Sequence, residues 1–108
     1  MMNNMDVQQG IQPISGEAME LSLTSENVLK ITKALSSATR LRILENLRKE
    51  EMDVSGIAKV LGQTEANISA QIAILHKAGL VNCRYQPGGH GVRKICSLAL
   101  DKVEISLY

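Results

Sequence analysis

The stretch "VSGIAKVLGQTEANISAQIAILHKAGLV", residues 54–81, decides the fold of this chain. Its first turns place apolar side chains at helical spacing, and Asp53 stands directly before them as a helix N-cap. Gly62 then supplies the left-handed backbone conformation that ends a helix. Thr64 is the N-cap of a second helix, which Gly79 ends in the same way. The stretch therefore predicts two short helices joined by a tight glycine turn.

The segments on both sides of this pair predict two further helices and a β-hairpin. A helix is expected over residues 26–37 with Ser25 as its N-cap, and another follows the break at residues 36–40. The inward side chains of that second helix are predicted to be Leu41, Ile43, Leu44 and Leu47. Residues 80–100 predict a hairpin with the turn cluster "QPGGHG" at its tip, and residues 101–108 predict another strand. The expected fold is mainly α, with four helices followed by a two- or three-stranded wing.

The domain organisation follows from length and local composition. With 108 residues the chain has room for one small core, which must be aliphatic because the sequence contains no Trp and no Phe. Residues 1–20 mix Asn, Gln and Gly without an apolar period, so we predict a flexible N-terminal tail there. Residues 21–108 are predicted to form the single folded domain.

Charge and composition narrow the functional classes. The formal net charge is +1, but residues 21–108 hold 12 basic and 8 acidic side chains, a difference of +4. Cys83 and Cys96 are too few for the disulfide scaffold of a small secreted protein. The sequence shows neither a signal peptide nor a run of transmembrane length, so we predict a cytoplasmic protein without a membrane segment. The absence of a catalytic triad pattern or phosphate loop predicts that it is not an enzyme and needs no cofactor.

Two motifs resemble one family of regulators. The segment "ALSSATRLRILENL", residues 34–47, resembles the signature of ArsR-like (arsenic-repressor type) transcriptional regulators. Residues 54–81 are similar to the helix-turn-helix of that family in register, including the "AGLV" exit into a glycine-tipped wing. The resemblance covers roughly residues 28–98. It implies a winged helix-turn-helix repressor or activator that binds an inverted repeat in double-stranded DNA as a homodimer, with the helix at residues 65–78 in the major groove, and it identifies no effector.

The predicted recognition helix carries few groups that read bases. Its buried stripe is expected to be Ile68, Ile72 and Leu75. The opposite side is mostly small, and alanine there can pack its methyl group against thymine. The predicted DNA contacts of this helix are Thr64, Glu65, Ala66, Asn67, Ser69, Ala70 and Gln71. Thr64 is assigned to a phosphate, whereas Glu65 either accepts from a cytosine amino group or serves only as a helix-start residue.

The wing is predicted to supply the charge that the helix lacks. Arg84, His90, Arg93 and Lys94 surround the glycine tip, which can follow a minor groove and bring cationic side chains into its negative potential. The alternative is that these are solvated hairpin charges. Arg40 and Arg42 are predicted to hold the DNA backbone, unless one of them belongs to an ion pair within the domain. Phosphate contacts and DNA shape should then carry much of the affinity, so binding should weaken steeply with salt.

The sensor function stays open at the level of sequence. Asp53 and Ser55 occupy the positions where metal-sensing relatives carry a Cys-x-Cys pair, so no metal site of that kind is predicted. Cys83 and Cys96 face each other only if paired residues of the hairpin sum to 179; a five-residue loop would place them on opposite faces. Two alternatives to the regulator therefore remain: a winged-helix protein-interaction module, and a thiol or metal switch that uses these cysteines with His90.

Overall fold

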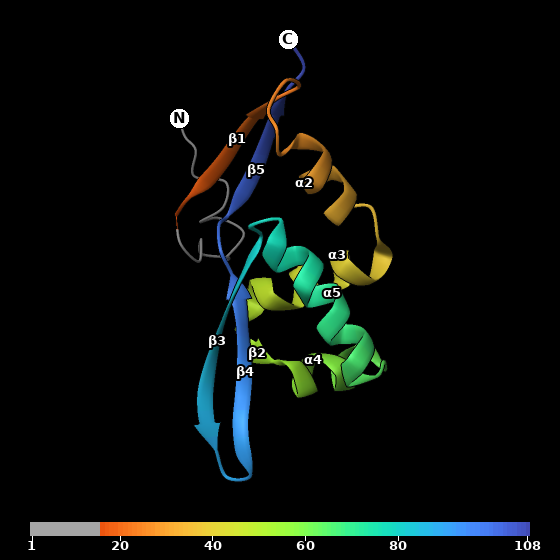
Figure 1. Cartoon of the computed structure of the whole chain (residues 1–108), viewed down its shortest axis with the longest axis vertical. Helices are drawn as coiled ribbons and strands as arrows, with labels where there is room; N and C mark the ends of the chain where they lie inside the picture. Colours follow the sequence, from red (N-terminus) through yellow and green to blue (C-terminus); the bar gives the residue numbers. More distant parts are fainter. Residues whose placement is uncertain (1–15) are drawn as a thin grey trace.

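The computed structural model of the chain describes residues 16–108, which form four helices and five strands (Figure 1). The helices are α2 (Val28–Ala34), α3 (Ala38–Lys49), α4 (Val54–Leu61) and α5 (Glu65–Lys77). The strands are β1 (Ala18–Ser22), β2 (Met52–Asp53), β3 (Val81–Gly88), β4 (Gly91–Leu98) and β5 (Lys102–Ser106). The predicted fold class, four helices followed by a wing, is confirmed.

The signals that delimit the central helix pair act as predicted. Asp53 caps α4 by accepting from the backbone N–H of Gly56 at 2.8 Å. Thr64 caps α5 by accepting from the backbone N–H of Asn67 at 3.1 Å. Gly62 between them has a φ of 68°, the left-handed conformation that favours glycine. The glycine turn and both caps thus set the angle at which α5 leaves α4.

The N-terminal helix begins later than predicted. The hydroxyl of Ser25 accepts from the backbone N–H of Ser22 at 2.9 Å, so Ser25 belongs to the turn after β1 and is not the cap of α2. Helix α2 starts at Val28 after Asn27, which makes no side-chain cap bond, and it ends at Ala34. The prediction of a helix over residues 26–37 was therefore wrong at both ends.

An aliphatic core joins the helices to the base of the wing. The side chains with no exposed surface are Ile31, Ala34, Ile43, Leu47, Ile57, Ile68, Ile72, Leu75 and Cys96. Each fully buried aliphatic side chain of this size contributes roughly 1.5–3 kcal/mol of transfer free energy. Leu41, predicted to point inward, is 49% exposed because it lies about 200° around α3 from the buried Ile43.

The strands form two separate sheets at opposite ends of the molecule (Figure 1). The wing is antiparallel with the order β2-β4-β3, so its third strand is the short β2 rather than the C-terminal segment. Strands β1 and β5 pair in parallel, with Ala18 opposite Lys102 and Ser22 opposite Ser106. Leu21 is buried in the core, and partly buried side chains of this sheet, Met19, Val103 and Ile105, pack against it.

The N-terminal boundary of the folded part differs from the prediction. Residues 18–20 belong to β1, so the predicted tail at residues 1–20 is wrong over these positions; its first 15 residues lie outside the described part of the chain. Pairing with β5 and the packing of Leu21 hold this segment on the domain. Within residues 16–108 none of the helices is long and apolar enough to cross a membrane.

Candidate DNA interface

Helix α5 presents a shallow exposed face beside its buried stripe. Ile68, Ile72 and Leu75 have no exposed surface, as predicted. The exposed residues of the helix are Glu65, Ala66, Asn67, Ser69, Ala70, Ala73, Ile74, His76 and Lys77. Because alanine and serine dominate the middle of this face, the helix backbone can approach a bound partner closely.

The two predicted amide readers on α5 belong to a chain of hydrogen bonds. Arg40 donates through Nη1 to Oε1 of Gln71 at 2.7 Å, and Nε2 of Gln71 donates to Oδ1 of Asn67 at 3.3 Å. Asn67 in turn donates to Oε1 of Gln63. The side chain of Gln71 is half-buried, whereas that of Ser69 on the same helix is exposed. The structure thus uses both amides to hold α5 in place.

Arg40 connects three helices. Its Nε donates to the backbone oxygen of Ala34 at 2.8 Å, and its Nη2 donates to that of Lys33 at 3.0 Å. These carbonyls end α2, where a cation is favourable. Together with the bond to Gln71, they use three of the five N–H donors of the guanidinium that was predicted to hold the DNA backbone. In this structure Arg40 therefore positions α5 against α2.

The N-terminus of α5 is open to solvent. Thr64 and Glu65 are both exposed, and the Thr64 hydroxyl is used by the cap bond to Asn67. The remaining backbone N–H groups of the first turn are donors without intrahelical partners, which suits a phosphate. A carboxylate in the first turn is stabilised by the helix dipole, so the location of Glu65 fits a helix-start role.

The two wing arginines form ion pairs with the segment that carries β2. Arg84 contacts Glu51 through two hydrogen bonds, Nη2 to Oε1 at 2.7 Å and Nη1 to Oε2 at 2.9 Å. The hydrogen bond from Arg84 lowers the pKa of the Glu51 carboxyl. Nε of Arg93 contacts Oδ2 of Asp53 at 2.9 Å. The pKa of Asp53 is lowered first by the backbone N–H of Gly56 and then by Arg93.

These ion pairs hold both wing arginines against the protein in this structure. Asp53 accepts from the α4 backbone with one oxygen and from Arg93 with the other, so it ties the wing to the start of α4. The other two predicted wing contacts are placed differently. His90 is exposed in the two-residue loop between β3 and β4, and Lys94 is half-buried opposite Tyr85.

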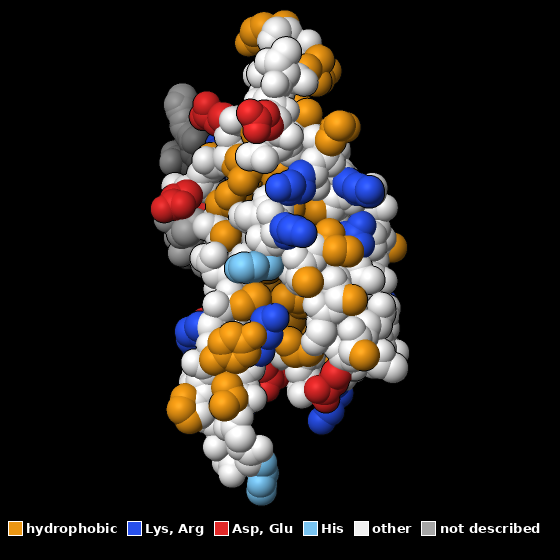
Figure 2. Space-filling model, in the orientation of Figure 1, with side chains coloured by type: hydrophobic (Ala, Val, Ile, Leu, Met, Phe, Trp, Pro, Cys, Tyr) orange, Lys and Arg blue, Asp and Glu red, His pale blue; other side chains and the backbone are white. Residues whose placement is uncertain are grey.

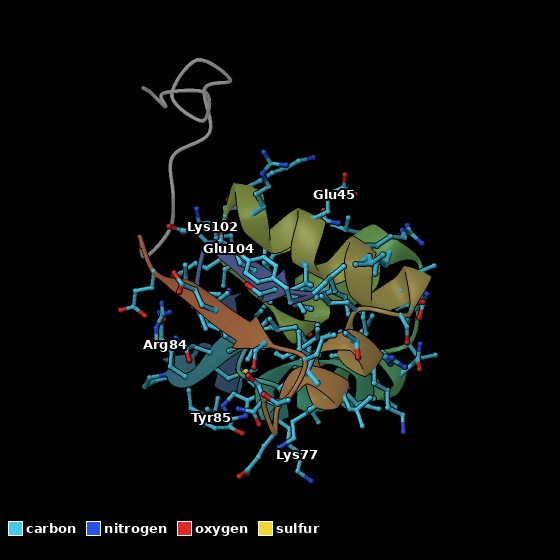
Figure 3. All side chains as sticks on the ribbon, turned by 90° about the horizontal axis from the view of Figure 1, so that it is seen from above. Glu45, Lys77, Arg84, Tyr85, Lys102 and Glu104 are labelled. Carbon is cyan, nitrogen blue, oxygen red and sulfur yellow. The ribbon has the colours of Figure 1, made fainter. Side chains whose placement is uncertain are left out.

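Three lysines that the sequence analysis left out of the site lie near α5. Figure 2 shows Lys and Arg side chains gathered over α2 and the C-terminal end of α5. The exposed lysines on these elements are Lys30, Lys33 and Lys77. Figure 3 shows Lys77 on the side of the molecule opposite Glu45. Lys77 lies on α5 itself, whereas Lys30 and Lys33 could not be assigned from sequence because only the tertiary fold brings α2 beside α5.

The two cysteines face each other across the wing. The hairpin adopts the register in which partners sum to 179, and the Sγ atoms of Cys83 and Cys96 lie 3.6 Å apart as free thiols. Burial raises the pKa of the Cys96 thiol to about 12. Among residues 16–108, no three His, Cys, Asp or Glu side chains gather in a way that would hold a metal ion.

An exposed helix after a glycine turn, followed by a hairpin packed on the same core, defines a winged helix-turn-helix DNA-binding domain. The sequence profile of the family described as "Bacterial regulatory protein, arsR family" matches residues 37–82. A crystal structure of a possible transcriptional regulatory protein from Mycobacterium bovis, a fragment of residues 1–100, is 32% identical with a TM-score of 0.61. That match covers 68% of this chain and 75% of the other. The chain belongs to the ArsR family and is a DNA-binding transcriptional regulator.

Two further solved structures are similar. The solution structure of a homodimeric winged helix-turn-helix DNA-binding domain from Mycobacterium bovis, a possible ArsR-family regulator, is 32% identical with a TM-score of 0.61. It matches over 68% of this chain and 65% of that one. NolR from Sinorhizobium fredii is 28% identical with a TM-score of 0.60, over 70% of this chain and 72% of its own.

Proposed function

We propose that this regulator is a cytoplasmic repressor that binds an inverted repeat as a homodimer and has no catalytic activity. The observation that carries the proposal is the exposed face of α5, where small side chains permit close approach and Lys77 adds charge at one end. A helix of this form enters a major groove, and a bound dimer would block access of the transcription machinery to the promoter.

The side chains on the exposed face of α5 determine how the protein would select its DNA site. Ser69 is available for a hydrogen bond to a base edge, and Ala66 and Ala70 can pack against thymine methyl groups. Asn67 and Gln71 would contribute indirectly to site selection, because their hydrogen bonds hold the helix in place. Phosphate contacts by Thr64 with the helix N-terminus and by the lysines near α5, together with DNA shape, would then supply much of the affinity.

Exposed apolar side chains near α2 support the homodimer. Leu29 on α2 is 78% exposed, Leu23 before it 56% and Leu41 on α3 49%. The related domain from Mycobacterium bovis is homodimeric. A second copy covering these leucines would add apolar burial that a domain of this size needs. It would also place two α5 helices for half-sites about one helical turn apart.

The decisive experiment measures DNA binding and its dependence on salt. A random duplex library is selected on the full chain, and the enriched duplex is then titrated by gel shift at several salt concentrations. Lys77→Gln should weaken binding and lower the salt slope by about one. Lys49→Gln is the matched control, because Lys49 is exposed and follows Glu45 by one turn of α3. Figure 3 shows Glu45 on the side of the molecule opposite Lys77.

Three results would contradict the proposal. No enrichment of any duplex at low salt would favour the winged-helix interaction module instead. Protection of a single half-site by a monomer would overturn the dimer. Increased transcription from a promoter that carries the selected duplex would overturn the repressor role.

A second candidate is a thiol switch, favoured by the 3.6 Å separation of Cys83 and Cys96. Hydrogen peroxide would oxidise the half-buried Cys83 to a sulfenic acid with loss of one water, and the Cys96 sulfur would then displace a second water to form the disulfide. The high pKa of Cys96 makes this step slow at neutral pH. Unchanged DNA affinity after peroxide treatment would exclude the switch.

A further inference from the structure

The sheet at the end of the molecule opposite the tip of the wing has a free edge (Figure 1). Among residues 16–108 it contains only β1 and β5, so β5 has a strand neighbour on one side only. No backbone hydrogen bond joins residues 102–106 to any other segment of that range. The N–H and C=O groups on such an edge can pair with a further strand, and small sheets gain stability when strands are added.

The two faces of this sheet differ in chemistry. One face packs on the core with its apolar side chains, Met19, Leu21, Val103 and Ile105. The other face carries the exposed charged side chains of the sheet, Glu20, Lys102 and Glu104. Because alternate residues of a strand lie on opposite faces, an added strand would have to match both patterns. The free edge therefore selects a partner with the same alternation of apolar and charged residues.

The charges on the polar face are unbalanced within one chain. Glu20 lies opposite Glu104 in the register of the two strands, and like charges at opposite positions are destabilising. Figure 3 shows Lys102 beside Glu104, where Nζ of the lysine lies 3.9 Å from Oε2 of the glutamate. Within residues 16–108 Glu20 forms no ion pair. Two carboxylates thus share one lysine, and an added strand would relieve the excess if it carried a cation opposite Glu104.

Strand β5 is complementary to itself. When two copies of β5 pair antiparallel with Val103 opposite Val103, Lys102 of each copy lies opposite Glu104 of the other. The four charged side chains lie on one face and alternate in sign, so each glutamate contacts a lysine of its own strand and one of the second strand. The two valines meet on the opposite face, where apolar side chains are required. A second copy therefore supplies both the charge and the alternation that this edge needs.

The free edge of β1 lacks this complementarity. Strand β1 reads AMELS and contains no basic residue. Antiparallel pairing of two β1 strands with their polar faces aligned places Glu20 opposite Ala18, Ser22 or another Glu20. None of these partners neutralises the carboxylate, which already faces Glu104. The charges thus favour β5 as the edge that a second copy occupies.

Exposed apolar side chains continue the contact beyond the strand. Leu107 follows β5 directly and is 75% exposed, and Leu23 follows β1 and is 56% exposed. Figure 2 shows hydrophobic side chains at this end of the molecule. The two-fold axis of an antiparallel pair runs perpendicular to the sheet, so the core faces of both copies lie on the same side. The edge is therefore continuous with the leucines of the proposed homodimer.

We propose that two copies of this chain associate through the free edge of β5 and form a continuous four-stranded sheet with the order β1-β5-β5-β1. This inference rests on the homodimer proposed above and identifies the contact that forms it. Backbone hydrogen bonds between the two β5 strands join the copies, and Lys102 with Glu104 sets their register. Because the sheet and the tip of the wing lie at opposite ends of the molecule, the contact leaves the wing uncovered (Figure 1).

Charge reversal tests the register. Lys102→Glu and Glu104→Lys should each weaken self-association about tenfold, because two pairs of opposite charge across the axis become pairs of like charge. The double variant has opposite charges at both positions again and should regain wild-type affinity. Sedimentation of the free protein over a concentration series measures the change. Lys59→Glu is the matched control, because Lys59 is exposed on α4, a helix away from this sheet (Figure 1).

A cysteine at the axis locates the contact. Val103→Cys should form a disulfide between two chains when oxidised glutathione is added, because the two side chains lie opposite each other. Ser106→Cys is the control, since three residues from the axis it lies about 20 Å from its own copy. Cys83 and Cys96 lie 3.6 Å apart within one chain, so the wild type measures the background of linked chains.

The outcomes separate the contact from the homodimer. Equal self-association of the wild type and both single charge variants, with no cross-link through Val103→Cys, would overturn the β5 contact. If Leu29→Ala then dissociates the dimer, α2 forms the interface and the homodimer itself stands. A monomeric wild type would overturn both the homodimer and its contact. Slow hydrogen exchange of the β5 amides in such a monomer would assign the edge to another segment of the same chain.

Discussion

The helix pair α4–α5 and the wing are held to the same domain by different forces. Ile57, Ile68, Ile72 and Leu75 of the helix pair have no exposed surface, so burial supplies the stability there. The outer half of the wing is attached by Arg84–Glu51 and Arg93–Asp53, whose arginines are about half exposed. Burial is insensitive to salt and acid, whereas exposed ion pairs weaken with both. The recognition helix is therefore held mainly by burial, whereas ion pairs contribute to holding the outer half of the wing.

Breaking the core should give the largest effect. Ile72→Ala removes a fully buried side chain between α5 and the rest of the core and should lower the free energy of unfolding by roughly 2–5 kcal/mol. Urea denaturation at neutral pH measures the change. Ile74→Ala, at a position 41% exposed on the same helix, is the control and should cost much less. Equal losses in the two variants would contradict the assignment of the buried stripe.

The base of the wing is part of the hydrophobic core, and the reactivity of its two cysteines tests this. Because burial raises the pKa of Cys96 to about 12, iodoacetamide at pH 8 should alkylate Cys96 about two orders of magnitude more slowly than a free thiol. Half-buried Cys83 should react first, as mass spectrometry of partly labelled native protein would show. Both thiols should react in urea. Rapid labelling of native Cys83→Ser would show that the base of the wing opens.

Removing Asp53 tests the junction between the two regions. Asp53→Ala deletes the cap of α4 and the partner of Arg93, and it should cost about 1–2 kcal/mol, measured by urea denaturation at pH 7. The folded pKa of this carboxyl lies below its ordinary value of 3.8, so its contribution is present above that pH. It is lost as the pH falls through the lower folded pKa. The variant should therefore lose less stability than wild type between pH 5 and strongly acidic conditions.

The smallest effect is expected at the exposed ion pair. Glu51→Gln removes the carboxylate that holds Arg84, and it should shift the melting temperature less than Asp53→Ala does. The difference from wild type should shrink in 1 M salt, about 3 Å of screening length, because salt then screens the attraction that only the wild type has. Glu45→Gln on α3 is the control for charge. A loss that persists unchanged in high salt would mean that Glu51 stabilises the wing in another way.

Much of the helix pair could be predicted because its signals are local. A cap acts on a backbone N–H three residues away, and Gly62 acts on its own backbone, so Asp53, Gly62 and Thr64 show their roles in the sequence. The buried stripe of α5 follows from the helical period. Strand β1 was missed for the opposite reason, since its partner β5 lies at the far end of the described chain.

The candidate DNA interface was only partly predictable. Exposure of Ala66, Ser69 and Ala70 follows from the same period as the buried stripe. Gln71 was predicted to contact bases, and no signal in the sequence indicated that α3 brings Arg40 to its amide oxygen. Arg84 and Tyr85 are neighbours in sequence, yet strand alternation sends them to opposite faces of the wing.

By itself, the sequence determined where the central helices begin and end, which side of α5 is buried, and which family the chain resembles. These are properties of neighbouring residues, set by backbone conformation and by the period of apolar side chains. Only the tertiary structure decided which polar side chains remain free to bind. An arginine or an amide can satisfy its hydrogen bonds with DNA or with the protein, and the choice depends on groups that folding brings close from distant segments.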